Sequence, residues 1–369
     1  MTYIHELASW PHFHWDEKWI AQQLAGVRHS QGRLLGRMEA RGVDVCVEAT
    51  LTCLTEEVVA SSEIEGEYLD KAQVRSSIAR RLDIDVDAVP PSDRDVEGVV
   101  DMMLDATARW NRPLTADRLQ GWHAGLFPTG RSGNMRIKVG AWRTSDSDPM
   151  QVVSGAAGKE RIHYQAPPAA RLDEEMTAFL QWFEAADDVD AVQKAAIAHL
   201  WFVTIHPFED GNGRIARAIA DLALARSERS ARRFYAVSSQ TRAERRTYYN
   251  VLEATQKGDL HITAWLSWFF ACLDRAVDGA EPMLAKILTK AAFWEMHAGE
   301  RLNNRQREML NRLLDGFEGK LTSSKWALIA KTSQDTAARD IDDLLRRGIL
   351  GKGQAGGRST SYSLVERKG

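Results

Sequence analysis

The chain has 369 residues, of which 44% are apolar and 27% are charged, and its formal net charge is −3. This length predicts two or three domains, and this composition predicts packed cores and excludes a disordered or uniformly basic chain. Its cysteines are Cys46, Cys53 and Cys272, and none forms a CxxC pair, which argues against a disulfide scaffold or a cysteine zinc site and favours a reducing cytoplasm.

The first residues, MTYIHELASWPHFHW, lack a basic segment followed by an apolar one. We therefore expect no secretory signal peptide. No run of about 18 apolar residues occurs in the chain, so we also expect no membrane span and a cytoplasmic protein.

Most of the chain has the apolar spacing of amphipathic helices, which predicts a mainly α fold. The predicted helices cover residues 16–40, 43–65, 93–110, 115–127, 172–186, 189–205, 214–226, 241–257 and 262–288. Residues 130–168 are instead rich in Gly, Ser, Asp and Pro and contain short β-type runs. This stretch predicts a β-hairpin flap inserted between helices.

A second boundary is predicted near residues 299–304. The elements expected beyond it are three short helices and two strands, at residues 305–317, 323–332, 334–347 and within 351–364. Three helices followed by a β-wing are typical of a winged-helix domain. The chain from residue 301 holds 14 Lys and Arg against 8 Asp and Glu, a net charge of +6, while the first 300 residues carry −9.

The positive charge of this last domain favours a nucleic-acid surface. The side chains expected on its recognition helix or wing are Gln334, Thr336, Arg339, Lys352 and Arg358. Four carboxylates on the same helix argue against that interpretation, namely Asp335, Asp340, Asp342 and Asp343. DNA binding and protein docking both stay open.

The run from His206 to Arg217, HPFEDGNGRIAR, carries the most chemistry. Two glycines flank Asn212, which suits a tight turn with positive φ. An amphipathic helix follows, so the turn presents free backbone N–H groups at a helix N-terminus. Such a terminus is a natural site for phosphate.

The charged residues of the run add to this interpretation. Arg214 and Arg217 lie three positions apart on one helix face, where guanidinium groups recognise phosphate oxygens. Asp210 supplies a carboxylate for Mg²⁺, and His206 can accept a proton at neutral pH. A calcium loop is the alternative, but Arg214 and Ile215 stand where further acidic ligands would be needed. The pattern predicts phosphoryl or nucleotidyl transfer.

The run matches the Fic signature HPFx(D/E)GNGRxxR at every defined position, and on it the chain is identified as a member of the Fic family. The resemblance covers about residues 121–276. Features of this region that resemble the family are Gly140, Trp142, Arg143, Tyr248 and Tyr249. The segment Trp10-Pro11-His12-Phe13 resembles the N-terminal region of a bacterial Fic subgroup that ends in a winged helix.

The resemblance implies transfer of AMP from ATP to Ser, Thr or Tyr hydroxyls of target proteins, with pyrophosphate leaving. It implies that His206 is the general base, that Asp210 holds Mg²⁺ between the α- and β-phosphates and that Arg217 clamps the γ-phosphate. Phe208 is implied to anchor the loop in the core, and Arg214 is implied to brace the phosphates. The residues implied to cradle the anion are Gly211, Asn212 and Gly213.

Two further groups of residues take roles from the resemblance. The flap residues Ile162, His163, Tyr164 and Gln165 are implied to align a target strand by main-chain pairing. Adenosine contacts are implied for Tyr248, Tyr249 and Gln256, although Gln256 replaces an Asn that is common in the family.

An inhibitory segment is also implied, because Ser61, Glu65 and Gly66 match the family pattern (S/T)xxxE(G/N) at the end of a predicted helix of about residues 43–66. The hypothesis is that Glu65 pairs with Arg217 and removes the guanidinium that would hold the γ-phosphate. ATP would then bind without its triphosphate in the productive position.

The resemblance predicts an N-terminal helical region (1–110), a Fic catalytic domain (111–290) and a winged-helix domain (301–369). Expected partners are ATP, a hydroxyl-bearing target protein, the chain itself as a self-modification target, a second copy in a homodimer, and DNA. Two alternatives stay open. One is a Fic enzyme that uses another phosphate donor or removes AMP. The other is a DNA-binding regulator that senses nucleotide, against which the intact His206 and Asp210 argue.

Overall fold

A computed structural model describes residues 2–84, 92–144, 149–155, 159–186, 189–353 and 360–365. The chain divides into two compact units, Met1–Ala280 and Glu281–Gly369, and the division falls within a single long helix. Arg358, which was expected on the wing, lies outside the described residues.

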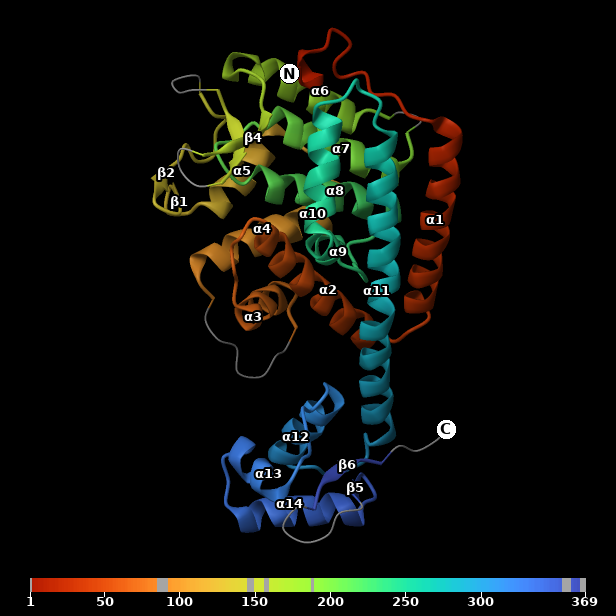
Figure 1. Ribbon diagram of the computed structural model, residues 1–369. Coiled ribbons are helices and arrows are strands. Elements are labelled where there is room, and N and C mark those ends of the chain that lie inside the picture. The colour runs from red at the N-terminus through yellow and green to blue at the C-terminus, as the bar shows by residue number, and fades with distance from the viewer. Residues whose placement is uncertain are drawn as a thin grey trace. The chain divides into compact units, whose positions relative to one another are not determined.

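Helices dominate both units, as the sequence predicts (Figure 1). The helices in the described part of the first unit are η1 (Ile4–Glu6), α1 (Glu17–Glu39), α2 (Val43–Ile64), α3 (Lys71–Arg81), α4 (Arg94–Ala108), α5 (Ala116–Leu126), η2 (Ala169–Arg171), α6 (Leu172–Glu184), α7 (Ala191–Ile205), α8 (Asn212–Glu228), α9 (Val237–Ala243) and α10 (Arg245–Gln256). Helix α11 (Thr263–Met296) begins in this unit and continues into the next.

The structure departs from the predicted helices in several places. Helix α11 continues to Met296, beyond its predicted end at residue 288, and the short helices η1 and η2 were not predicted. Helix α3 was not predicted, because its buried side carries few large apolar side chains. Its N-cap Asp70, which accepts a hydrogen bond from the Gln73 N–H at 2.8 Å, is the signal that was available. The helix predicted over residues 241–257 is divided into α9 and α10 at Glu244, whose carboxylate accepts hydrogen bonds from Arg275 of α11.

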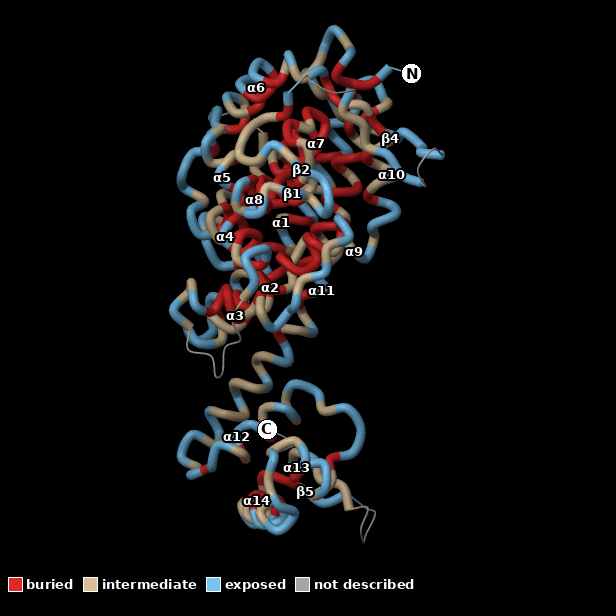
Figure 2. The backbone as a smooth tube through the Cα atoms, turned by 90° about the vertical axis from the view of Figure 1, so that its left-hand side faces the viewer, coloured by how far each residue is buried: buried red, intermediate tan, exposed pale blue. Residues whose placement is uncertain are grey.

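The core of the first unit is built on α7 and α8, which lie side by side (Figure 2). Both helices carry buried residues around their whole circumference. A helix that is buried on all sides belongs to the interior of a protein. The turn that joins these two helices, residues 206–211, is therefore supported on both sides by helices that are buried in the core.

Helix α2 runs through the same core and contacts α3, α4, α8 and α9. Its side chain Glu57 is buried and accepts hydrogen bonds from the Ser238 N–H at 2.9 and 3.1 Å. This contact fixes α2 along its axis. The last turn of α2 lies at the beginning of α8, where Ser61 and Glu65 contact Arg217.

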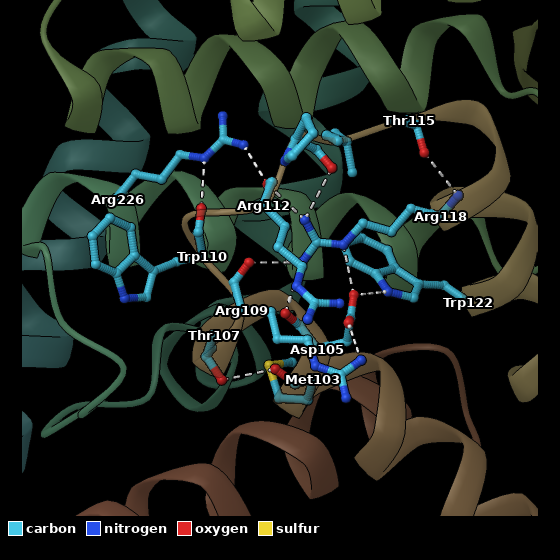
Figure 3. A network of polar contacts seen from close by, with 12 residues as sticks. Met103, Asp105, Thr107, Arg109, Trp110, Arg112, Thr115, Arg118, Trp122 and Arg226 are labelled. Carbon is cyan, nitrogen blue, oxygen red and sulfur yellow. Dashed lines mark hydrogen bonds and ion pairs between the residues drawn. The ribbon is translucent and has the colours of Figure 1, made fainter.

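Helices α4 and α5 are joined by a polar network that Figure 3 shows from close by. Asp105 of α4 accepts hydrogen bonds from the guanidinium of Arg118 and, at 2.8 Å, from the indole N–H of Trp122. Burial alone would raise the pKa of Asp105, but these hydrogen bonds hold it below its ordinary value. Arg226 of α8 donates to the Trp110 carbonyl at 2.9 Å, so α8 is tied to the same network.

The predicted flap contains two small hairpins. Strands β1 (Arg131–Ser132) and β2 (Met135–Arg136) form one of them. Strands β3 (Gln151–Ser154) and β4 (Arg161–Gln165) form the other, which is antiparallel with an irregularity between the second and third residues of β3. The flap thus follows the β-type runs in the sequence.

The second unit has its own buried core around Trp326 and Leu344. Its elements after α11 are α12 (Asn304–Leu314), α13 (Ser323–Ile329), α14 (Gln334–Arg346), β5 (Leu350–Lys352) and β6 (Tyr362–Leu364). Strands β5 and β6 pair antiparallel. Three helices and a hairpin stand in the expected order, and the assignment of this unit as a winged helix stays a prediction.

None of the helices in the ranges given above combines the length and the apolar character that a membrane crossing needs.

Candidate active site

The turn between α7 and α8 has the conformation that its sequence predicts. Gly211 is the N-cap of α8 with φ of 79°, and a Cβ atom there would lie 2.9 Å from the ring of Phe127. The side chain of Asn212 closes the turn: its Oδ1 accepts from the Phe208 N–H at 3.0 Å and its Nδ2 donates to the Phe208 carbonyl at 2.9 Å. The backbone N–H groups of the first turn of α8 therefore stay directed out of the helix.

The ring of Phe208 holds this turn in the core. It is fully buried and stacks on the imidazole of His123 with centroids 4.1 Å apart. The indole of Trp142 lies 4.9 Å from the same ring. The Gly140 N–H donates to His123 Nδ1 at 3.0 Å, so the flap residues around Gly140 and Trp142 are attached to the turn through aromatic contacts and one hydrogen bond.

His206 ends α7 in a left-handed conformation with φ of 52°. Its Nδ1 lies 3.2 Å from the Val203 carbonyl, which accepts a hydrogen bond when Nδ1 carries the proton. Burial lowers the pKa of His206 to about 4, although the hydrogen bond to Val203 acts in the opposite direction. The imidazole is therefore neutral at pH 7, and its Nε2 can accept a proton.

Asp210 lies on the side of the turn that faces β1. Its Oδ1 accepts from the Gly211 N–H at 2.6 Å, and its Oδ2 accepts from the Ser132 hydroxyl. The described residues hold no group of three or more His, Cys, Asp or Glu side chains that could bind a metal by themselves. A single carboxylate nevertheless fits Mg²⁺ in a nucleotide site, because phosphate oxygens and water complete its shell.

Arg217 contacts the end of α2 through three hydrogen bonds. Its Nε donates to the Ser61 hydroxyl at 2.9 Å, and its Nη2 donates to the Ser61 carbonyl at 2.8 Å and to Glu65 Oε1 at 2.7 Å. Burial alone would lower the pKa of Arg217, but the charge of Glu65 raises it above its ordinary value. The ion pair expected from the sequence is thus present.

Because Gly213 has no side chain, the carboxylate of Glu65 fits beside it. A Cβ atom at Gly213 would lie 2.1 Å from Glu65 Oε1. Glu65 itself is the C-cap of α2, and Gly66 follows with φ of 86°, which is the conformation that turns the chain after a helix. The carboxylate therefore lies against the turn at a position that only a glycine at residue 213 permits.

Arg214 has a partner that the sequence did not predict. Its side chain lies over the ring of Phe127, 5.0 Å from the centroid, and its Nη1 donates to the carboxylate of Glu67. Glu67 stands two residues after Glu65, just beyond the recognised pattern. The available signal was the repeat of Glu on both sides of Gly66.

A cavity of about 710 Å³ opens beside the turn. Its lining combines predicted site residues from the inhibitory segment, the flap, the turn and α10, namely Glu65, His163, Tyr164, His206, Gly213, Tyr248, Tyr249 and Gln256. The phenol of Tyr248 lies 3.0 Å from His199 Nε2, and the amide of Gln256 donates to Thr204 Oγ1 at 3.3 Å. A volume of several hundred cubic ångströms suits a ligand of nucleotide size.

The cavity lining does not include Asp210, Arg214 or Arg217, and it ends at Glu65 and Gly213. The two motif arginines are buried against carboxylates instead. The structure therefore brings His206, the expected base, and the residues expected to contact adenosine into one cavity. The two arginines expected to bind phosphate instead pair with Glu65 and Glu67, at the end of α2 and just after it.

The flap residues are not equivalent. Tyr164 is buried and its hydroxyl donates to the Thr204 carbonyl at 2.6 Å, so only its main chain is available to a target strand. His163 is held on both ring nitrogens, by Glu253 at 2.6 Å and Ser154 at 2.5 Å. Ile162 is 46% exposed, and neither it nor Gln165 lines the cavity.

Comparison with known families assigns two regions of the chain. Residues 113–224 match the model of the Fic/DOC family, and residues 3–84 match a domain of unknown function, DUF4172. The Fic/DOC match includes the flap, α7, the turn and most of α8.

Curated relatives match parts of the chain. A protein adenylyltransferase Fic from Nematostella vectensis is 33% identical over 115 residues, 30% of this chain and 25% of that one. The protein adenylyltransferase fic-1 of Caenorhabditis elegans is 37% identical over 89 residues, which are 24% and 16% of the two chains. A uridine 5′-monophosphate transferase from Xanthomonas campestris is 32% identical over 126 residues, 31% and 21% of the two. The matched part is thus a quarter or less of each relative.

Solved structures share the fold. A Fic family protein from Desulfovibrio desulfuricans G20 superimposes with a TM-score of 0.55 at 20% identity, over 95% of this chain and 97% of that one. A Fic domain containing signaling protein from Bacteroides thetaiotaomicron gives 0.52 at 18% identity, over 69% and 95%. Residues 113–224 thus form a domain whose sequence matches the Fic/DOC family model, and the two solved structures show that the fold is shared.

Proposed function

We propose that this protein transfers AMP from ATP to hydroxyl groups of proteins, and that the end of α2 inhibits the transfer. The single observation that carries this proposal is the cavity in which the neutral imidazole of His206 lies beside Gly213 of the anion-binding turn. Curated relatives named protein adenylyltransferases support the same reaction class.

The proposed step is an in-line displacement at the α-phosphorus of ATP. The oxygen of a Ser, Thr or Tyr hydroxyl forms the new bond to phosphorus, the bond to the bridging α–β oxygen breaks, and pyrophosphate leaves. His206 Nε2 takes the hydroxyl proton, while Nδ1 keeps its hydrogen bond to Val203. A base placed in this way contributes about 10²–10⁴-fold to the rate.

The other residues of the turn would position the nucleotide. The backbone N–H groups at the start of α8 and the two arginines would bind phosphate oxygens. Asp210 would hold Mg²⁺, which supplies neutralisation of phosphate charge when it is bound. Tyr248, Tyr249 and Gln256 would contact the adenosine from the far wall of the cavity.

The inhibition follows from the ion pair at Arg217. While Glu65 holds this guanidinium at 2.7 Å, the γ-phosphate has no clamp. Removal of one partner from a buried pair is costly, so the free Arg217 would bind phosphate strongly. ATP would compete with Glu65 for the same donor.

The test uses three purified proteins: the wild type, Glu65→Gly and Glu65→Gly with His206→Ala. With ATP labelled in the α-phosphate, we expect Glu65→Gly to raise incorporation into protein at least about tenfold, the change that 1.4 kcal/mol produces. The added His206→Ala should return it to background. Equal incorporation by wild type and Glu65→Gly would contradict the inhibitory role of Glu65. An active double variant would contradict the role of His206 as the base.

The donor and the acceptor are decided in the same experiment. The uridine 5′-monophosphate transferase among the relatives makes UTP the second donor to compare, beside GTP and CDP-choline. Mass spectrometry of the products identifies the adduct, the modified residue type and any self-modification. An adduct other than AMP would assign another donor to the same site.

A further inference from the structure

The carboxylate of Glu67 forms an ion pair with Arg214, the other arginine of the motif. Arg214 is only 2% exposed, whereas the side chain of Glu67 is 44% exposed. Glu65 meanwhile pairs with Arg217. Two carboxylates from one short segment thus occupy both guanidinium groups that face the anion-binding turn.

The backbone after α2 fixes this double contact. The N–H groups of Glu65 and Glu67 both donate to the Ser62 carbonyl at 3.0 Å, and the Gly66 N–H donates to the Glu63 carbonyl at 3.1 Å. The positive φ of Gly66 lets the chain reverse between the two glutamates. Their carboxylates are therefore presented to the start of α8 as a pair.

The charges of this segment correspond to those of a phosphate tail. A guanidinium recognises carboxylate and phosphate oxygens with the same planar set of donors. Burial raises the pKa of Glu67, and the charge of Arg214 acts against that rise. A nucleotide that binds the turn would have to displace the Glu67 carboxylate as well as that of Glu65.

We propose that Glu67 determines specificity for the phosphate tail of the nucleotide, by occupying Arg214 independently of the contact between Glu65 and Arg217. The idea rests on the proposed function only in that a nucleotide binds in this cavity. After Glu65 is removed, Glu67 still occupies one arginine, so phosphate affinity is restored in part. Loss of both carboxylates restores it in full.

A purely structural role for Glu67 makes a different prediction. If Glu67 only held the loop after α2 in place, its loss would change the affinity for every ligand of the cavity, including adenosine. If it competes with phosphate, its loss changes the affinity for ADP and ATP and leaves adenosine unchanged. The difference between ligands separates the two roles.

The experiment measures binding by calorimetry, with magnesium present and without a protein target. The proteins are Glu65→Gly and Glu65→Gly with Glu67→Gln, and the ligands are adenosine, ADP and ATP. We expect the added Glu67→Gln to tighten ADP and ATP binding about tenfold and to change adenosine binding less than about twofold.

Glu63→Gln in the Glu65→Gly background is the matched control. Glu63 belongs to the same turn of α2, but its carboxylate pairs with Arg242, outside the motif. The control removes the same charge from the same segment and should leave all three affinities within about twofold. An equal gain from Glu63→Gln, or a gain for adenosine as large as that for ATP, would overturn the proposal.

Binding is read without any transfer step, so this inference and the proposed function fail separately. A protein that binds ADP tightly only after Glu67→Gln, yet transfers no AMP, would support the role of Glu67 and contradict the transferase. A protein that transfers AMP but whose ATP affinity does not change with Glu67→Gln would support the transferase and contradict the role of Glu67.

Discussion

The conformation of His206 is held by a buried arginine. A non-glycine residue with φ of 52° costs about 1–3 kcal/mol unless its surroundings fix it. The Nε of Arg143 donates to the His206 carbonyl at 2.8 Å, its Nη2 donates to the Pro167 carbonyl at 2.6 Å, and its own N–H donates to the Pro207 carbonyl at 2.9 Å. The proposed base is thus oriented by contacts to its main chain that leave Nε2 free.

His199 provides a pH test at the residue scale. Its burial, together with the charge of Arg217, lowers its pKa to about 3. Below the unfolded pKa of about 6.5, the unfolded chain binds a proton at this position while the folded chain does not, so stability is lost as the pH falls. From pH 7 to pH 5 this group should cost the wild type about 2 kcal/mol.

The measurement compares wild type with His199→Gln, because Gln can keep a hydrogen bond to the hydroxyl of Tyr248 but does not titrate. Denaturant unfolding at pH 7 and pH 5 gives the difference in the free energy of unfolding between the two proteins. We expect that difference to shift by about 2 kcal/mol in favour of the variant at pH 5. A difference that stays constant with pH would contradict a neutral buried His199.

At the scale of elements, α4 and α5 cross where two glycines meet. A Cβ atom at Gly98 of α4 would lie 1.8 Å from the carbonyl oxygen of Gly125 of α5, which is backbone and cannot move by rotating a side chain. Gly98→Ala should therefore push the helices apart and lower the free energy of unfolding by about 1–3 kcal/mol. Thermal unfolding of the purified variant measures the loss.

The control for this substitution is Gly121→Ala, which lies in α5 with no atom within 4 Å of the added Cβ. Alanine favours the helix over glycine by up to about 1 kcal/mol, so this variant should be as stable as the wild type or more stable. If the two variants unfold at the same temperature, the claim that the contact of α4 with α5 requires glycine at residue 98 is contradicted.

The elements around the site also bear on the proposed inhibition by α2. Helix α2 is anchored by Glu57, two turns before Glu65, through the N–H of Ser238. A change in Glu65 or Glu67 alters only the last turn and the residues after it. Substitutions there can therefore test inhibition without removing the helix from the core.

At the scale of the whole molecule, the two units carry opposite net charges and separate cores. Two of the four carboxylates that argued against DNA binding by α14 form ion pairs within the second unit. Asp340 is buried and accepts from Arg305 at 2.8 Å, and Asp343 accepts from Arg347 at 2.9 Å. Of the four acidic residues of this helix, Asp335 and Asp342 are the exposed ones.

DNA binding by the second unit stays a prediction of the sequence, and α14, where Arg339 is exposed, is the place to test it. Filter binding of the full chain over a salt series should give an affinity that falls as salt rises, and Arg339→Gln should reduce the salt slope by about 1. Arg312→Gln on α12 removes an equal charge from an exposed pair with Glu308 and should leave the slope unchanged. An affinity that does not depend on salt would leave protein docking as the role of this unit.

The sequence by itself determined the features that depend on neighbouring residues. The spacing of apolar residues located most helices, and the Gly-Asn-Gly turn before Arg214 and Arg217 indicated phosphate chemistry, because local conformation and helix-face spacing follow from short patterns. The match to the Fic/DOC family model covers residues 113–224, which include this run.

Only the tertiary structure decided which side chains meet. The pairing of Glu67 with Arg214 joins residues 147 positions apart, and the division between α9 and α10 lies where Arg275 reaches Glu244 from another helix. In the sequence, Asp340 counted against DNA binding. The structure shows that it is buried and paired with Arg305 of another helix. Ion pairs and burial are set by the packing of distant segments, and the pair of Glu65 with Arg217 was expected only because both residues belong to recognised family patterns.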